Sequence, residues 1–117
     1  MEKSIKLKIS GKDYLVHFPN VGQILDIESL KSALTNGSYG DLCKMGTKTA
    51  NAALDLADTI ATFVILIPEL KDTLDVKSFT ELDPFLAKKL VTPYKKQFLP
   101  WFMEINEELR KFGVDEE

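Results

Sequence analysis

The chain of 117 residues has few of the side chains from which covalent or metal-based sites are usually built. It contains one cysteine, Cys43, and one histidine, His17. A single cysteine cannot form a disulfide within the chain, which is typical of proteins from a reducing compartment. One histidine and one cysteine also fall short of the roughly four nitrogen or sulfur ligands of a structural zinc site. The sequence therefore predicts no disulfide framework and no structural zinc site. A hard-metal site made only of carboxylates is conceivable, but the chain has no D-x-D-x-D-G loop, and we predict no metal and no cofactor.

Long apolar runs and a basic excess are missing as well. The most apolar stretch, residues 60–67, is much shorter than the roughly 20 residues of a bilayer-spanning helix, and the first residues lack the apolar segment of a secretory signal. Lys and Arg total 15 against 18 Asp and Glu, a net charge of −3. Binding to a nucleic acid backbone needs clustered cations. We therefore expect a cytoplasmic protein that binds neither nucleic acid nor a membrane.

The composition is that of an ordinary folded domain. Hydrophobic residues make up 44% of the chain and charged residues 28%, as in soluble globular proteins. The length fits one compact domain, and no repeat or linker divides it. We predict a single α+β domain over residues 1–113 and a frayed tail over residues 114–117.

Residues 4–18 alternate apolar and polar side chains with a period of two, which predicts a β-hairpin. With Gly11 and Lys12 at the tip, the large apolar residues face one another, in the pairs Ile9–Tyr14, Leu7–Val16 and Ile5–Phe18, with Ser10 opposite Asp13. His17 then lies on the opposite, exposed face. Because an isolated hairpin is marginally stable, helices or another chain's strand should cover its apolar face.

Helical spacing of apolar residues begins directly after the hairpin. Asn20 and Gln23 form a capping-box pattern that predicts a helix over residues 20–34, and Asn36-Gly37 is typical of its left-handed end. A longer helix is predicted over residues 47–67. Its C-terminal half is apolar nearly all round, which is typical of a central helix with neighbours on several sides.

Proline marks the remaining helical region. Pro68 ends the central helix, and residues 69–74 are expected to add one short turn. Asp83 and Pro84 are typical of the cap and first position of a further helix. Pro93 should kink that helix and Pro100 should bend or restart it before it ends at Gly113. The predicted architecture is an N-terminal hairpin packed on a bundle of three or four helices.

Few residues in these elements suggest chemistry. Asp55 and Asp58 share one face of the central helix with Lys48, Asn51 and Thr62. They could form a carboxylate pair for acid–base catalysis, but we interpret the face as a solvated strip. We expect Cys43 to be a buried or semi-buried structural thiol, and the lysines at 88–89 and 95–96 to lie on a solvated face. No catalytic residue is predicted.

The C-terminal region is rich in large apolar side chains. Phe98, Leu99, Trp101, Phe102 and Met103 lie within six positions, more than one helix face needs. They fit either the core beneath the hairpin or an amphipathic helix with aromatic anchors for a partner. On the second interpretation, the partner-binding residues are Phe98, Trp101, Phe102 and Ile105.

Seven short strings are spread over most of the chain: residues 5–9 (IKLKI), 18–22 (FPNVG), 27–28 (IE), 34–37 (LTNG), 61–63 (ATF), 66–68 (LIP) and 94–101 (YKKQFLPW). Together these strings resemble small tail-assembly proteins of bacteriophages and prophages. The resemblance implies a non-enzymatic tail assembly chaperone that binds the long, apolar tape-measure protein until tail-tube subunits polymerise around it. It also implies self-association, and a place in the bacterial cytoplasm or in the virion. Many members of this group are purely helical, whereas this chain has a predicted hairpin.

Two other functions compete with this interpretation. The chain could be a virion structural subunit, a tail or head accessory protein that assembles through its hairpin edge. It could also be a small enzyme that uses Asp55 and Asp58, in which case both carboxylates should share a concave pocket.

Overall fold

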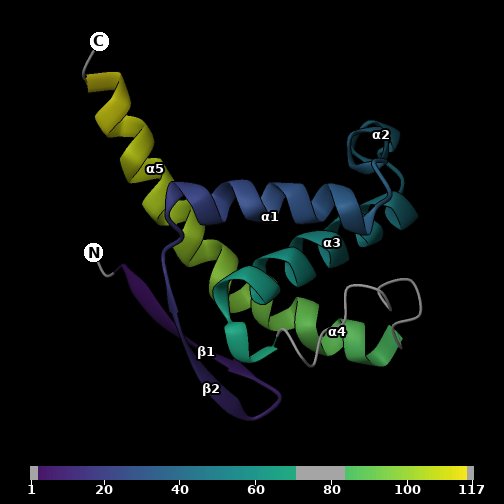
Figure 1. Cartoon of the computed structure of the whole chain (residues 1–117), viewed down its shortest axis with the longest axis horizontal. Coiled ribbons are helices and arrows are strands. Elements are labelled where there is room, and N and C mark those ends of the chain that lie inside the picture. Colours follow the sequence, from purple (N-terminus) through teal and green to yellow (C-terminus); the bar gives the residue numbers. More distant parts are fainter. Residues whose placement is uncertain (1–2, 71–83, 116–117) are drawn as a thin grey trace.

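The computed structural model describes residues 3–70 and 84–115, apart from the side chains of residue 86 and residues 110–115. The strands β1 (Ser4–Ile9) and β2 (Lys12–His17) form an antiparallel hairpin that lies against helices (Figure 1). The helical elements are α1 (Val21–Leu34), α2 (Tyr39–Met45), α3 (Lys48–Leu66), η1 (Pro68–Leu70), α4 (Pro84–Pro93), η3 (Tyr94–Phe98) and α5 (Leu99–Asp115). The predicted α+β class, with an N-terminal hairpin on helices, is confirmed.

The hairpin is present, but its predicted pairing is wrong by two residues. Ile9 pairs with Lys12, Leu7 with Tyr14 and Ile5 with Val16, so that Ser10 and Gly11 form the tip. Both tip residues have positive φ, 52° and 82°, as a two-residue turn that matches the strand twist requires. Gly11 tolerates this conformation, whereas a tip at Gly11-Lys12 would force it on a lysine. A shift by two leaves every side chain on its predicted face.

The first and central helices follow the prediction closely. Asn20 caps α1, and the side chains of Asn20 and Gln23 each accept a hydrogen bond from the backbone N–H of the other residue, which forms a capping box. Asn36 and Gly37 both have positive φ after the helix. Thr47 caps α3 by accepting a hydrogen bond from the backbone N–H of Ala50. Nine residues of α3 are buried, which makes α3 the central helix of the fold.

Helix α2 was not predicted, and it changes the environment of the cysteine. No helix is predicted between residues 37 and 47, but Tyr39 and Leu42 lie one turn apart and are partly buried where α2 packs on α3. These two side chains take the inner positions of the short helix. Cys43 is therefore exposed, and its prediction as a buried or semi-buried thiol is wrong.

Helices α4 and α5 form one bent rod with a π-helical turn between them. Pro93 ends α4, η3 follows, and the N–H of Leu99 donates to the carbonyl of Tyr94, five residues back. This wider turn lies between the two prolines, Pro93 and Pro100, that interrupt the helical hydrogen-bond ladder. The bend predicted here is thus a π turn. Helix α5 runs to Asp115, past Gly113, because glycine in a helix costs only about 1 kcal/mol.

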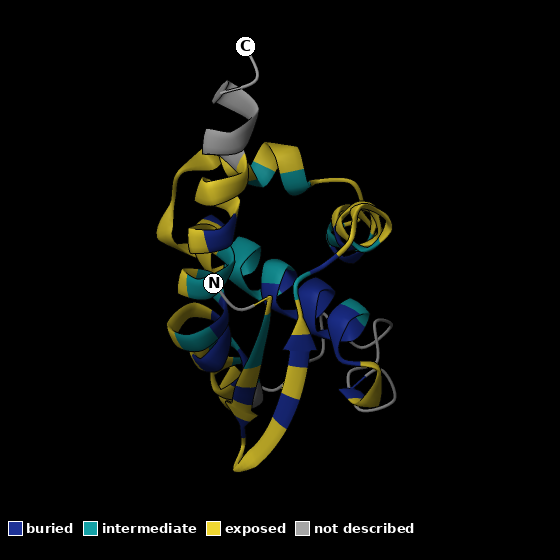
Figure 2. Cartoon of the chain, turned by 90° about the vertical axis from the view of Figure 1, so that its left-hand side faces the viewer, coloured by how far each residue is buried: buried dark blue, intermediate teal, exposed yellow. Residues whose placement is uncertain are grey.

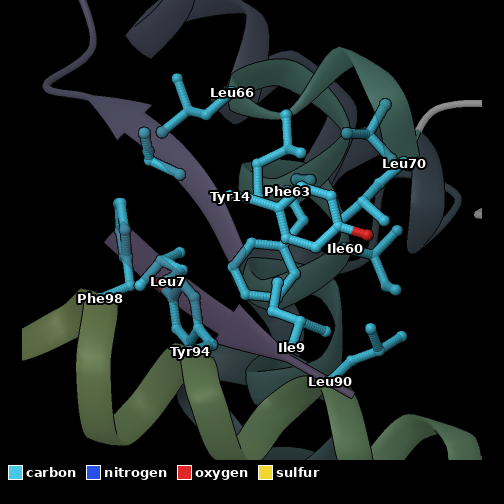
Figure 3. Close-up of a cluster of buried hydrophobic side chains, with 14 of the residues drawn as sticks. Leu7, Ile9, Tyr14, Ile60, Phe63, Leu66, Leu70, Leu90, Tyr94 and Phe98 are labelled. Atoms are coloured by element: carbon cyan, nitrogen blue, oxygen red, sulfur yellow. The ribbon is translucent and has the colours of Figure 1, made fainter. Parts of the chain in front are cut away.

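The core lies between the hairpin, α3 and the bent rod (Figure 3). Leu7 and Val16 of the hairpin and Phe63 of α3 are almost completely buried. Figure 2 shows the alternation along the strands and the buried middle of the fold. The predicted turn over residues 69–74 is described only as far as Leu70, in η1. The predicted cap Asp83 lies outside the described residues.

Candidate functional site

The aromatic residues at the C-terminal end form a connected cluster with the hairpin. Phe18, which follows β2, stacks on Phe102 with ring centroids 5.2 Å apart and meets Trp101 edge-on at 5.8 Å. Phe98 contacts both Trp101 and Phe102 and also stacks on Tyr94. These contacts join η3 and α5 to the end of the hairpin. We call Phe18, Tyr94, Phe98, Trp101 and Phe102 the aromatic cluster.

The four predicted partner-binding residues differ in how far they are buried. Phe98 is 2% exposed and Ile105 is 7% exposed, so the chain's own core accounts for both. Trp101 and Phe102 are only partly buried. Of the four, these two retain surface that a partner could contact.

A small pocket of about 70 Å³ lies between α1 and the aromatic cluster, and Thr62 of α3 contributes to its lining. One wall belongs to α1, and the other to η3 and α5; the lining residues are Ile24, Ile27, Glu28, Lys31, Thr62, Tyr94, Phe98 and Phe102. We call this feature the α1–α5 groove.

Apolar side chains continue outward from both walls. Val21 is 74% exposed and Leu25 is 62% exposed. Val21 lies one turn from both Ile24 and Leu25, at spacings of three and four residues, so the exposed pair flanks the groove-lining Ile24 on α1. On α5, Leu109 is 57% exposed and continues the stripe of Phe102 and Ile105. Figure 1 shows α5 projecting past the end of α1. The groove therefore opens onto apolar surface that the described residues leave uncovered.

A polar cluster lies beside the base of the groove. Lys31 of α1 is 3.1 Å from Glu28 and 3.4 Å from Asp58, measured from its ammonium nitrogen to a carboxylate oxygen of each. The hydroxyl of Tyr39 donates to the same Asp58 oxygen at 2.5 Å. Lys31 also lies 5.6 Å from the centre of the Tyr39 ring. Asp58 thus joins α1 and α2 to α3.

Asp55 has a different partner one turn earlier on α3. Its carboxylate is 2.6 Å from the ammonium group of Lys95 in η3. Thr62, one turn beyond Asp58, is buried and lines the same pocket as Tyr94. The prediction of a solvated strip is therefore wrong for Asp55, Asp58 and Thr62, because α1, α2 and η3 pack beside them. Lys48 and Asn51 are exposed, because they lie earlier in α3 than the part beside which these elements pack.

Two tyrosines in this region have perturbed acidity. Burial, followed by the nearby charge of Asp58, raises the pKa of Tyr94 to about 12. Burial and then the hydrogen bond to Asp58 also raise the pKa of Tyr39 above its ordinary value. Both hydroxyls therefore stay protonated at neutral pH, and their contacts with the carboxylate-bearing helix α3 are structural.

The two edges of the hairpin differ in whether a neighbouring side chain bonds to their backbone groups. The side-chain amide of Gln97 in η3 accepts a hydrogen bond from the backbone N–H of Lys8 at 2.9 Å and donates one to its carbonyl at 3.1 Å. Gln97 thereby occupies the outer edge of β1, as a neighbouring strand would. Along β2, Asp13, Leu15 and His17 are exposed, and His17 lies on the face predicted for it.

The remaining surface features give weaker indications of function. An open hollow of about 650 Å³ at the hairpin tip has a largely apolar lining of Ser10, Phe85, Lys88, Lys89, Thr92 and Pro93. Both of these lysines are exposed. Within residues 3–70 and 84–115, no three histidine, cysteine, aspartate or glutamate side chains lie close enough together to hold a metal ion.

By length and apolar composition alone, α3 could cross a membrane. Half of its apolar 18-residue stretch is buried inside the fold, however, as in the core helix of a globular domain. Comparison with protein-family models, with curated proteins and with solved structures finds no match to this chain.

Proposed function

We propose that this chain is a bacteriophage tail assembly chaperone-like protein, which binds the tape-measure protein during tail morphogenesis in the cytoplasm of the bacterial host. The proposal describes a binding protein without catalytic activity. The observation that carries it is the α1–α5 groove, with uncovered apolar side chains on both walls. The resemblance of the sequence strings to small tail-assembly proteins supplies the identity of the partner.

The shape of the groove favours a helical partner. Its walls are two helices, and the exposed side chains on α1 repeat at three and four residues, as they do in surfaces that receive an amphipathic helix. Trp101 and Phe102 would contribute large, partly exposed rings beside it, and such rings are common anchors of binding energy.

A long apolar helix needs such a partner before assembly. The uncovered apolar stripe of a tape-measure protein would promote aggregation. A chaperone that buries the stripe in its groove keeps the helix soluble and releases it when tail-tube subunits cover the same surface.

Co-expression with a tape-measure protein tests the proposal. Wild-type protein should keep the tape-measure protein in the soluble fraction and should co-purify with it. Leu25→Lys places a charge on the apolar wall of α1 and should reduce the recovered complex by about tenfold, the effect of losing roughly 1.4 kcal/mol of binding free energy. Leu25 is exposed, so the variant should fold normally.

Met45→Lys is the matched control. Met45 is as exposed as Leu25 but lies on α2, which forms neither wall of the groove, and its substitution should leave the complex intact. An unchanged solubility of the tape-measure protein with wild-type chain would contradict the proposal. Equal losses for the two variants would show that the groove is not the binding surface.

A second candidate function rests on the hairpin. The uncovered edge of β2 suits a virion structural subunit that adds its strand to a neighbouring sheet. The two roles differ in the finished particle, because only a structural subunit requires its β2 edge to pair with a neighbouring subunit there.

A further inference from the structure

The backbone of β2 presents hydrogen-bonding groups that no described residue satisfies. Both backbone groups of Lys8 point to Gln97 and hence away from β2. Lys8 faces Asp13 in the hairpin. In an antiparallel pair, facing residues point their backbone groups either toward each other or both away. Asp13, and by alternation Leu15 and His17, therefore direct their N–H and C=O groups outward from β2.

Among the described residues, only the β2 edge of the hairpin is open for pairing with a further strand. The edge of β1 is occupied by Gln97 and lies beside α4 and η3. Figure 2 shows β1 between β2 and the side of the fold that carries the bent rod. An open edge with a large exposed apolar side chain, Leu15, is a site for pairing with a further strand.

We propose that β2 pairs antiparallel with β2 of a second copy of this chain, forming a four-stranded sheet across a twofold axis at Leu15. In this register Leu15 faces Leu15 of the other copy, and Asp13 faces His17 on both sides of the axis. All three outward-pointing residues then lie opposite outward-pointing residues, and each facing pair exchanges two backbone hydrogen bonds.

The side chains fit this arrangement. Asp13, Leu15 and His17 alternate with the buried Tyr14 and Val16, so they share the exposed face of the sheet. The apolar pair at the axis buries the exposed Leu15 side chains. On either side, an aspartate carboxylate faces a histidine, whose ring N–H can donate to it. A strand that is complementary to itself in both backbone and side chains specifies a second copy rather than an unrelated partner.

Amide hydrogen exchange on the full chain at low and high protein concentration tests the register directly. The amides of Asp13, Leu15 and His17 should exchange fast in dilute samples and become protected as the dimer forms, as followed in parallel by sedimentation velocity. The amides of Tyr14 and Val16 already bond to β1 and should be protected at both concentrations. A monomer at all concentrations would overturn the proposal. A dimer with these three amides still exposed, or protection that appears only when a foreign protein is added, would do the same.

Charge variants separate this pairing from other contacts. Leu15→Lys places two like charges opposite each other and should weaken dimerisation by about tenfold or more. His17→Asp puts a carboxylate opposite Asp13 and should also weaken it, whereas the matched His17→Lys should maintain or strengthen it. The double variant Asp13→His with His17→Asp restores the opposite pairs and should recover the dimer. Equal behaviour of His17→Asp and His17→Lys would contradict the register.

The dimer is independent of the proposed function. The β2 variants lie outside the α1–α5 groove, so they should retain binding to a tape-measure protein. Leu25→Lys should in turn dimerise normally. Failure of one experiment therefore leaves the other interpretable.

Discussion

At the scale of single residues, burial decides which aromatic side chains hold the fold and which remain available to a partner. Phe98 is almost completely buried among the rings of Tyr94, Trp101 and Phe102, whereas Phe102 packs on Phe18 and is only partly buried. Two neighbours on one helix stripe thus have different surroundings. The difference follows from the position of Phe98 at the bend of the rod, where α3 and the hairpin both approach.

Truncating the buried ring should test this division. Phe98→Ala should lower the free energy of unfolding by about 3–5 kcal/mol, because it removes a large buried side chain and leaves a cavity. Leu109→Ala, on the exposed continuation of the same stripe, should change it by less than about 0.5 kcal/mol. Urea denaturation of both variants measures the two values. Similar values would mean that Phe98 is not part of the core.

Tyr94 should make stability depend on alkaline pH. Unfolded tyrosine ionises with a pKa of about 10, and burial raises the pKa of Tyr94 to about 12 in the folded chain. Its contribution is therefore complete below pH 10 and is lost as the pH rises towards 12. Over this range wild type should lose up to about 3 kcal/mol more than Tyr94→Phe. Urea midpoints at a series of pH values measure the difference, and parallel curves would contradict it.

At the scale of the elements, the hairpin shows how far alternation alone determines structure. Its period of two correctly predicts which side chains lie on each face, but any even shift of register satisfies the same pattern. The turn decides between such registers, and here Ser10 and Gly11 both adopt positive φ. A serine at the first turn position is a weak signal compared with asparagine or aspartate, so the tip could not be located from the sequence.

The turn should respond to substitution accordingly. Ser10→Asn suits the positive φ and should raise the free energy of unfolding by about 0.5 kcal/mol. Gly11→Ala should lower it by about 1 kcal/mol through backbone strain alone, since no atom lies within 4 Å of the added Cβ. Gly40→Ala, in helix α2 and equally unobstructed, should be neutral or stabilising. Thermal denaturation compares all three, and a stabilising Gly11→Ala would contradict the observed turn.

The helices also differ in whether local sequence signals or contacts between distant residues determine their positions. Caps and apolar spacing locate α1 and α3, because both signals lie within the helix itself. Helix α2 is seven residues long, too short for its spacing to stand out from a loop. Its position depends on the contact between Tyr39 and Asp58, which are 19 residues apart. The ion pair between Lys95 and Asp55 likewise joins residues far apart in the sequence, and no local pattern could indicate it.

At the scale of the whole molecule, the fold covers one side of its hairpin and one side of α1 and leaves the others open. The core joins the hairpin, α3 and the bent rod, while the outer surface of α1 and the projecting part of α5 keep apolar residues exposed. The sequence indicated this surplus of apolar surface near the C-terminus. It could not indicate the contribution of α1, because Ile24 lines a groove, with Val21 and Leu25 beside it, only when α5 lies opposite.

The central claim is that the α1–α5 groove receives a helix. The most direct measurement is a two-dimensional amide NMR titration of the full chain with a soluble helical segment of a tape-measure protein. The account predicts that shifts concentrate on residues 21–28 and 101–109, with β2 and α2 unaffected at a fixed concentration of this chain. Shifts confined to the hairpin or α2, or no shifts at all, would contradict it.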